Sequence, residues 1–234
     1  MYNHEELPTA DTFARLATEL HDSEGVEETV DTVVQFAVRA LACCQAGIVL
    51  AVRGRRPEIG AVTDPLIERI HAVQIAADDG PMIAALQREE LIRIADVRTD
   101  GRWPHWAALV CASGIRTVLH LPLMVGNRAS GVLSLYCETP DALTGDDEAV
   151  AHILARHASV AVASAQHEAS LAQAVDARKL IGQAMGILME RYGLSDDRAF
   201  EVLKRYSQDS NTKLRDVAQQ LIDTRKLPVN GQLR

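Results

Sequence analysis

The segment from Asp146 to Ile181 contains neither glycine nor proline and is rich in Ala, Leu, Gln and Glu. Because these residue types favour helix and the two strongest helix breakers are missing, we predict one continuous helix that is roughly 50 Å long. The sequence from Thr144 to Asp147 fits a capping box, in which a threonine and an acidic residue three positions later bind free backbone N–H groups at a helix start. Such a helix is longer than a small domain is wide, so part of it must project or pair with another helix.

Apolar side chains recur along this helix at intervals of seven residues. This repeat is typical of a coiled-coil seam, although polar groups interrupt the seam here. We expect two copies of the chain to pair in parallel through the helix and form a homodimer; the alternative is that the helix lies on its own N-terminal domain. The lines of the repeat are Ile153, Val160, His167, Ala174, Ile181 and Leu188, and Val150, His157, Ser164, Leu171, Arg178 and Met185.

Two glycines, Gly182 and Gly186, follow the glycine-free run within the same helical pattern. Each costs about 1 kcal/mol relative to alanine inside a helix and has no side chain to bury. We therefore expect another helix to approach the backbone closely here, while the flanking Arg178, Lys179 and Glu190 exclude a membrane span. The residues assigned to helix packing or to the dimer are Ile153, Val160, Leu171, Ile181, Gly182, Gly186 and Leu188.

The last part of the chain has the pattern of a compact three-helix unit. We expect the first helix to stop at Tyr192-Gly193, and Ser195 is a favourable N-cap for the second helix. Residues 209–212 break the second helix, and the third stops before Pro228. The inward apolar positions are Ala199, Phe200, Leu203, Tyr206, Leu214, Val217, Ala218, Leu221 and Ile222, and the outward basic positions are Arg191, Lys204, Arg205, Lys213, Arg215, Arg225 and Lys226.

The N-terminal part mixes helical periodicity with short apolar runs that indicate strands. Gly25 breaks a first helical region, and a hairpin turn at Gly126-Asn127 joins the last two strands. Residues 65–90 combine helical periodicity with turn residues. The predicted helices are residues 9–44 and 106–113, and the predicted strands are residues 46–52, 91–97, 117–125 and 131–137.

The net charge of −8 is unevenly distributed along the chain. Residues 166–234 hold 11 Lys or Arg and 9 Asp or Glu, a balance of +2 that leaves −10 for the remainder. This asymmetry favours an acidic sensor joined to a mildly basic effector.

No apolar run is long enough for a membrane helix, and acidic residues and a proline stand where a signal peptide would have a basic patch. We therefore expect a soluble, cytoplasmic protein.

The sequence shows no pattern of catalytic or metal-binding residues. The Walker GxxxxGK[ST], GxSxG, HExxH and zinc-binding spacings do not occur, and neither does CxxC. We therefore expect no enzyme activity, no metal and no required cofactor. The four cysteines are expected to be reduced and buried, and only the adjacent pair Cys43 and Cys44 merits a redox test; the others are Cys111 and Cys137.

The string ARKLIGQAMGILMERYGLSDDRAFEVLKRYSQDSNTKLRDVAQQLID resembles the ANTAR family of RNA-binding antitermination domains. One position departs from the family, because many members carry lysine where this chain has Met185. A charge that could pair with phosphate is therefore missing there. The matching positions are Arg178, Ile181, Gln183-Ala184, Gly186, Leu188-Met189, Gly193-Leu194-Ser195, Ala199-Phe200, Leu203, Ser207, Asn211, Leu214 and Val217-Ala218.

The ANTAR resemblance implies binding to paired RNA hairpins in a leader transcript, where dimers stabilise an antiterminator and RNA polymerase reads through. Basic residues would make salt-sensitive phosphate contacts, and polar groups would read loop bases. For each charge the alternative is an ordinary solvated residue, and for Tyr206 it is a core position. The candidates for phosphate contacts are Lys204, Arg205, Lys213 and Arg215, those for base contacts are Tyr206, Ser207 and Asn211, and Arg191 belongs to the same basic surface.

The stretch DDGPMIAALQREELIRIADVRTDGRWPHWAALVCASGIRTVLHLPLMVGNRASGVLSLYCETPDALTGDDEAVAHILARHASVAVA resembles a GAF domain, a sheet with flanking helices that often binds a small ligand. The matching positions are Gly80-Pro81, Ala95-Asp96, Arg102-Trp103, Gly114-Ile115, Pro122-Leu123 and Gly131-Leu133 with Leu135-Tyr136.

The GAF resemblance implies a ligand pocket near Met82, Asp96, Trp103 and Trp106, although the tryptophans would more simply pin a loop onto the sheet. Family members that bind tetrapyrroles use Cys or His, for which His105 or His120 could serve; a lone histidine is more often structural. A sulfoxide-reductase-like GAF domain would fit the cysteines but would leave the C-terminal unit unexplained.

These observations predict an α+β protein, with a GAF-like antiparallel sheet flanked by helices, a long connecting helix that forms a coiled coil, and a C-terminal three-helix bundle. We interpret the chain as an antitermination regulator in which an unknown small-molecule ligand of the sensor controls RNA binding. The expected parts are an N-terminal tail (1–11), the sensor (12–165), the connecting helix (146–181, overlapping both domains), the RNA-binding domain (168–228) and a C-terminal tail (229–234).

Two other functions remain open on the sequence alone. A three-helix unit can imitate a helix-turn-helix and bind DNA, but residues 212–215 supply few base-reading side chains at the start of the third helix. The unit could also be a protein-interaction module that binds no nucleic acid.

Overall fold

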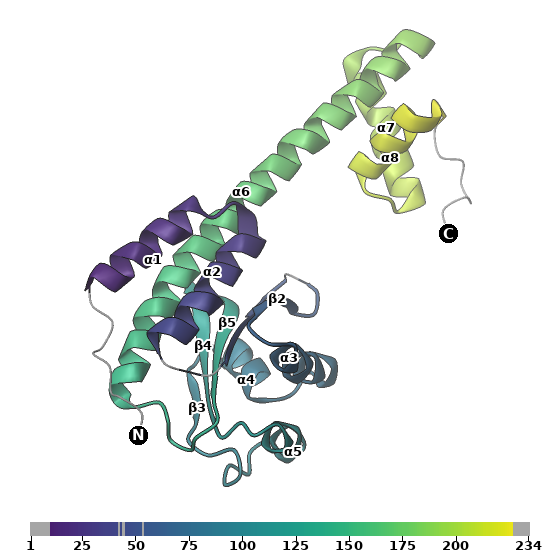
Figure 1. The fold of residues 1–234 in the computed structure, drawn as a ribbon. Coiled ribbons are helices and arrows are strands. Elements are labelled where there is room, and N and C mark those ends of the chain that lie inside the picture. Colours follow the sequence, from purple (N-terminus) through teal and green to yellow (C-terminus); the bar gives the residue numbers. More distant parts are fainter. Residues whose placement is uncertain (1–9, 42, 44, 53, 227–234) are drawn as a thin grey trace. The chain divides into compact units, whose positions relative to one another are not determined.

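Figure 1 shows the computed structural model of the chain, which describes residues 10–41, 43, 45–52 and 54–226. The chain divides into two compact units, residues 1–167 and 168–234, and helix α6 (Gly145–Tyr192) contributes to both. The first unit combines a sheet with helices and the second is helical, which confirms the predicted α+β class. The predicted tails, 1–11 and 229–234, lie wholly or largely outside the described residues, as do Cys44 and Pro228.

A five-stranded antiparallel sheet organises the first unit. Its strands are β1 (Gln45–Leu50), β2 (Glu58–Val62), β3 (Ile92–Ile94), β4 (Thr117–Val125) and β5 (Arg128–Cys137). They lie in the order β2-β1-β5-β4-β3, and the long β4–β5 hairpin turns at Gly126, whose φ of 62° suits glycine. The sequence pattern does not predict β2, because this short edge strand is partly exposed along its whole length and has no apolar alternation.

Helices cover both faces of this sheet (Figure 1). Because alternate residues of a strand point to opposite faces, Leu119 of β4 lies in one core and its neighbour Val118 lies in the other. The helices on the Leu119 side are α1 (Ala10–Asp22), α2 (Gly25–Ala40) and the first part of α6, and those on the Val118 side are α3 (Pro65–Ala77), α4 (Pro81–Arg88) and α5 (Pro104–Ala112).

The second unit packs the last part of α6 with α7 (Asp196–Ser210) and α8 (Leu214–Thr224). Gly193, with a φ of 63°, follows the end of α6, and the Ser195 hydroxyl accepts a hydrogen bond from the Arg198 N–H at 3.4 Å. The predicted stop and the predicted N-cap are therefore both present. The core consists of Ala184, Leu188, Ala199, Leu203, Val217, Ala218 and Leu221.

Helix α6 begins at the predicted capping box and continues for 48 residues. The Thr144 N–H donates to Asp147 Oδ2 at 2.8 Å, and the Asp147 N–H donates to Thr144 Oγ1 at 3.2 Å. The helix passes through Gly182 and Gly186 without interruption. In the described part of the chain, no helix is both long enough and apolar enough to cross a membrane.

Candidate functional site

The predicted base-contact residues Tyr206, Ser207 and Asn211 lie where α7 turns into α8. The Ser207 hydroxyl donates to the Thr212 carbonyl at 2.6 Å, and Asn211 caps α7 with a left-handed φ of 51°. Tyr206 is half-buried and packs against the core of the second unit. All three residues shape the turn, and of the three only Asn211 is exposed enough to offer its side chain freely to a partner.

Exposed basic side chains lie on α7 and α8, before and after this turn in the chain. Arg205 lies 3.7 Å from Asp209 and Arg215 lies 3.1 Å from Asp216, but exposed pairs of this kind contribute only about 0–1 kcal/mol, so a phosphate group can displace the carboxylates. Lys213 is the N-cap of α8, where free backbone N–H groups add to the positive potential. Within the described second unit, no salt bridge involves either lysine of this group, whose members are Lys204, Arg205, Lys213 and Arg215.

The remaining predicted RNA-binding residue, Arg191, lies apart from this group, near the C-terminal end of α6. Its Nη1 donates to the carbonyl of Arg225, the C-cap of α8, at 2.5 Å. Because Lys213 and Arg225 cap the two ends of α8, about 18 Å of helix separates them. The structure therefore separates Arg191, which contacts the C-terminal end of α8, from the predicted RNA-binding residues of α7 and the start of α8.

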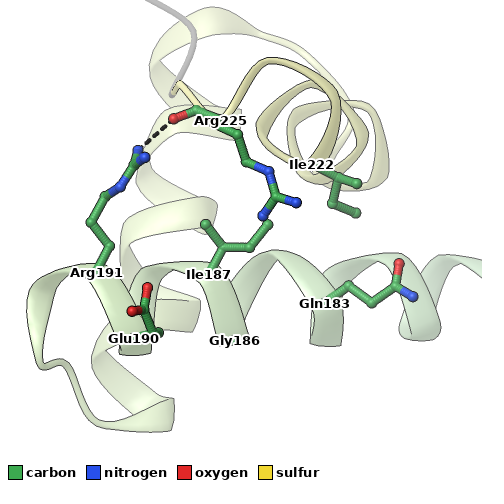
Figure 2. A pocket seen from close by; sticks show the side chains of 7 residues that line it. All are labelled: Gln183, Gly186, Ile187, Glu190, Arg191, Ile222 and Arg225. Carbon is green, nitrogen blue, oxygen red and sulfur yellow. Dashed lines mark hydrogen bonds between the residues drawn. The ribbon is translucent and has the colours of Figure 1, made fainter.

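An open groove with a volume of about 540 Å³ lies beside Arg191, between α6 and the end of α8 (Figure 2). Polar and charged side chains share its lining with two isoleucines. Sequence reasoning does not group these residues, because more than one helix supplies them and only the fold brings the two helices together. The lining residues are Gln183, Gly186, Ile187, Glu190, Arg191, Ile222 and Arg225.

The seven-residue lines predicted along α6 do not stay on one face of the helix. Ile153 and Val160 are 44% and 73% exposed, whereas Leu188 on the same line is 1% exposed in the core of the second unit. Ile181 is partly buried against that core. An α-helix drifts by about 20° for every seven residues, so a strict heptad line moves from the solvent side to the buried side.

The second unit exposes apolar side chains on α6 near the two glycines. Leu171 is 53% exposed, and Val175 and Met189, which are also exposed, lie on the same side of the helix as Gly182. A Cβ atom placed on Gly182 or Gly186 would meet nothing within 4 Å. No described part of the chain therefore makes the close approach that was predicted at these glycines.

In the first unit, the predicted pocket residue Asp96 forms an ion pair with Arg116. Arg116 Nη2 donates to Asp96 Oδ2 at 2.6 Å, and Nε donates to Oδ1 at 3.0 Å. These hydrogen bonds, with one from the Arg98 N–H, lower the pKa of the Asp96 carboxyl group. Asp96 thus holds the loop that follows β3.

The other predicted pocket residues fall into two groups. Trp103 is half-buried at the start of α5, with the Arg102 guanidinium 4.7 Å above its ring, so it anchors the loop. Met82 and Trp106 are buried in the core between the sheet and helices α3–α5. The Trp106 ring lies 6.4 Å from the ring of His120 in this core.

A row of buried polar groups, which sequence reasoning does not assemble, crosses the same core. His71 Nε2 lies 2.9 Å from the Tyr136 hydroxyl oxygen, and His120 Nδ1 lies 2.8 Å from the Ser134 hydroxyl oxygen. Burial lowers the pKa of His71 to about 3 and the pKa of His120 well below its usual value, so both rings are neutral. One sequence signal was available: His120 and Ser134 are polar residues in apolar strands, and they prove to be direct cross-strand partners.

Three nitrogens of this core have no hydrogen-bond partner among the described residues: His71 Nδ1, His120 Nε2 and Trp106 Nε1. A buried polar atom without a partner costs about 1–3 kcal/mol. Such atoms are rare in folded proteins, so three of them in one core are an unusual feature of this unit. We refer to these three side chains as the buried polar cluster.

No metal centre is visible in the described ranges, where no group of three or more His, Cys, Asp or Glu residues is arranged to hold an ion. His105 is exposed, whereas His120 is enclosed. Cys43 and Cys137 are buried and Cys111 is half-buried.

Comparison with protein-family models identifies both units. A GAF domain model matches residues 23–163, and an ANTAR domain model matches residues 169–222. No curated protein sequence matches the chain.

Solved structures resemble the chain through GAF domains. The GAF domain from Acinetobacter phosphoenolpyruvate-protein phosphotransferase has a TM-score of 0.54 and 20% identity, covering 67% of this chain and 93% of its own. The corresponding domain from Coxiella burnetii has a TM-score of 0.55 and 17% identity, with coverage of 68% and 95%. Free methionine-R-sulfoxide reductase from Neisseria meningitidis, in complex with its substrate, has a TM-score of 0.53 and 13% identity, with coverage of 72% and 99%. At these identities the likeness shows the fold alone.

Proposed function

Since this chain belongs to the GAF domain family and carries an ANTAR domain after its GAF domain, we propose that this ANTAR-type regulator is a transcription antiterminator that binds paired RNA hairpins. It acts in the cytoplasm and has no catalytic activity of its own. A small molecule bound by the GAF domain controls RNA binding, and two copies of the chain act together.

The observation that carries this proposal is the exposed basic group around the α7–α8 turn. Lys204 and Lys213 make no salt bridge within the described unit, and the carboxylates beside Arg205 and Arg215 are exposed and easily displaced. Each such cation increases the affinity for a phosphate backbone, because its contact with a phosphate releases counterions from the nucleic acid. The turn itself is held by internal hydrogen bonds, so the cations are presented on a rigid support.

Exposed apolar residues on α6 support the proposed homodimer. Ile153 and Val160 are exposed in the first unit, and Leu171, Val175 and Met189 are exposed in the second. Large apolar side chains that are exposed along one helix are typical of a surface that a second helix covers. Two ANTAR domains held in one dimer can bind two hairpins of one transcript.

The buried polar cluster supports a ligand for the GAF domain. His71 and His120 are neutral, so a neutral molecule with both hydrogen-bond donors and acceptors fits this core better than an ion. Met82 lies in the same core and supplies apolar contact.

Electrophoretic mobility shift of a leader RNA with two hairpins, chosen from transcripts that copurify with the protein, tests the proposal. With four phosphate contacts per copy, the affinity should fall on the order of 100-fold for each bound copy between 50 and 200 mM salt. Replacing Lys204 and Arg205 together by alanine should reduce the slope of log affinity against log salt by about 1.4–1.8 per bound copy.

A matched variant, Arg69→Ala with Arg88→Ala, removes the same charge from exposed positions of the GAF domain and should leave the slope unchanged. Competition between the hairpin RNA and duplex DNA distinguishes RNA binding from DNA binding. Preference for the duplex would favour a DNA-binding regulator, and dimerisation without binding to either would favour a protein-interaction module.

A further inference from the structure

We propose that a junction between the loop that follows β3 and the segment that leads into α6 transmits changes at α5 to the first turns of α6. The junction consists of Arg93, Thr117 and Asp141 with the backbone that they contact, and it lies within the first unit. This inference rests on the proposed control of RNA binding by the GAF unit. It names the residues through which a change in the GAF core reaches the connecting helix.

Two segments without helix or strand meet at this junction. Residues 95–103, the α5 loop, follow β3 and lead into α5, whose Trp106 is buried in the core. Residues 138–144, the α6 linker, follow β5 and end at the capping box of α6. The Asp141 N–H donates to the Ala95 carbonyl at 2.7 Å, so a backbone hydrogen bond joins the two segments directly.

Thr117 is the buried centre of the junction. Its hydroxyl oxygen lies 2.9 Å from the Ala95 carbonyl oxygen and 2.8 Å from the Thr139 carbonyl oxygen. The same oxygen accepts a hydrogen bond from the Ala142 N–H at 3.2 Å. Because a hydroxyl group has only one hydrogen, it donates fully to one carbonyl at a time. The junction therefore has two arrangements, one that binds the α5 loop and one that binds the α6 linker.

Arg93 connects the same two segments from the half-buried side of β3. Its Nη2 donates to the Leu143 carbonyl at 3.0 Å and to the carboxylate of Asp141. The carbonyl of Arg93 accepts a hydrogen bond from Arg102 Nη2 at 3.0 Å. The side chain of Arg93 thus holds the α6 linker, while its backbone holds the α5 loop.

The backbone of Asp141 shows that the linker depends on these contacts. Its φ of 53° lies in the left-handed region, which is uncommon for residues other than glycine. Such a conformation persists where the surrounding structure imposes it. Here the Ala95 carbonyl binds the Asp141 N–H and Arg93 binds the carboxylate, so both partners of Asp141 come from β3 or the α5 loop.

A change in the packing of α5 therefore reaches α6 in three steps. Trp106 fixes α5 in the core, and a displaced α5 moves the loop that precedes it. A displaced loop withdraws the Ala95 carbonyl from the junction. The freed linker then no longer holds Thr144, whose reciprocal hydrogen bonds with Asp147 start the helix.

The test perturbs α5 and measures α6 by amide hydrogen exchange in the full-length protein. Trp106→Phe changes the core contact of α5 without any ligand. It should accelerate exchange of residues 145–155 by about fivefold, the effect of one lost hydrogen bond on an opening equilibrium. Thr117→Val should accelerate this exchange by itself, and adding Trp106→Phe to it should have less than about a twofold further effect, because coupled sites are not additive.

Three further variants locate the connection. Thr117→Ser keeps the hydroxyl that Thr117→Val removes, so it should retain the wild-type response to Trp106→Phe. Arg93→Ala should reduce the response, and since this side chain is partly exposed, its loss leaves no buried cavity. The matched control Arg98→Ala removes an exposed arginine of the same loop that is outside the junction, and it should keep the full response.

The proposal is wrong if Trp106→Phe leaves exchange at the start of α6 unchanged in the wild-type background. It is equally wrong if the acceleration is the same with and without the Thr117 hydroxyl. Neither measurement involves RNA, so the junction is tested whether or not the protein binds a transcript.

Mobility shift of the leader RNA tests the function on which the inference rests. Thr117→Val should change the RNA affinity by at least about fivefold, the lower end of usual allosteric coupling, with the salt slope unchanged because no phosphate contact is lost. An unchanged affinity together with the expected exchange result would contradict control of RNA binding through the junction. Failure of the wild-type protein to bind the RNA would contradict the proposed function and leave the junction in place.

Discussion

The two units of this protein place their polar groups in opposite environments. In the GAF unit, His71, His120 and Trp106 are buried, and each has a nitrogen without a hydrogen-bond partner among the described residues. In the ANTAR unit, Lys204 and Lys213 are exposed, and the groove between α6 and the end of α8 is open to solvent. Burial makes each polar contact specific and costly, whereas exposure makes contacts weak individually and sensitive to salt. The arrangement agrees with the proposal that one unit selects a small molecule and the other binds a polyanion.

The comparison also extends to titratable groups. The GAF unit holds every histidine of the chain, and residues 168–234 contain none. Both tryptophans are likewise in the GAF unit. Each unit can therefore be followed separately, which makes the differences between them measurable.

The largest expected effect concerns the independence of the two cores. Leu203 is fully buried in the core of the ANTAR unit, and Leu133 is fully buried in the GAF unit. Replacing either residue by alanine should destabilise its own unit by about 2–5 kcal/mol, because a buried leucine is replaced by a cavity. Tryptophan fluorescence during urea unfolding reports on the GAF unit, and amide exchange of α7 and α8 reports on the ANTAR unit.

Leu203→Ala should leave the urea midpoint of the tryptophan fluorescence transition unchanged. Leu133→Ala should shift this midpoint to a lower urea concentration. A shift of that transition in Leu203→Ala would show that the two cores unfold together, and the comparison between separate units would then fail.

A smaller effect is expected from pH. The pKa of His71 is about 3 in the folded protein and about 6.5 when unfolded, so the unfolded chain binds the proton first as pH falls. The stability of the GAF unit should therefore be complete above pH 6.5 and fall as pH decreases toward 3. From His71 alone the loss at pH 5 is about 2 kcal/mol, and His120 acts in the same direction.

Urea midpoints measured by tryptophan fluorescence at pH 7 and pH 5 check this expectation. The His71→Gln variant should be less stable than wild type at pH 7. It should also lose less stability than wild type when the pH is lowered from 7 to 5. The ANTAR unit serves as an internal control, because it has no histidine to titrate in this range. Equal losses in both units would contradict the assignment of the pH dependence to the buried histidines.

The smallest effect concerns the two glycines of α6. At protein concentrations where the chain is monomeric, Gly186→Ala and Gly182→Ala should each stabilise the ANTAR unit by up to about 1 kcal/mol, since alanine favours helix and neither Cβ would meet a described atom within 4 Å. Amide exchange of the helices of the ANTAR unit measures this effect. Destabilisation of the monomeric unit by either variant would contradict the open space around these glycines.

Local patterns predicted much of the fold. The capping box at Thr144, the stop at Gly193 and the N-cap at Ser195 are all present, because each depends only on residues within one turn of a helix. Strand β4 matches its predicted range of 117–125 because apolar residues predominate along its full length. Strand β2 is short and partly exposed, since it lies at the edge of the sheet.

The candidate sites were less accessible to sequence reasoning. The basic residues of the ANTAR unit were identified as a set, but the separation of Arg191 from the others depends on how α8 is placed. In the GAF unit, His71 and Tyr136 are 65 residues apart and form one hydrogen bond. No local pattern in the sequence connects two such positions.

The sequence by itself determined the order of the elements, the two-domain organisation and the helical character of α6, because propensity and capping act between neighbours in the chain. Tertiary structure decided which residues of α6 are buried, since the turn angle of the helix carries a heptad line from Val160 on the surface to Leu188 in the core. It also decided which polar atoms remain without partners and where a groove opens. These properties depend on groups that only folding brings within a few ångströms of each other.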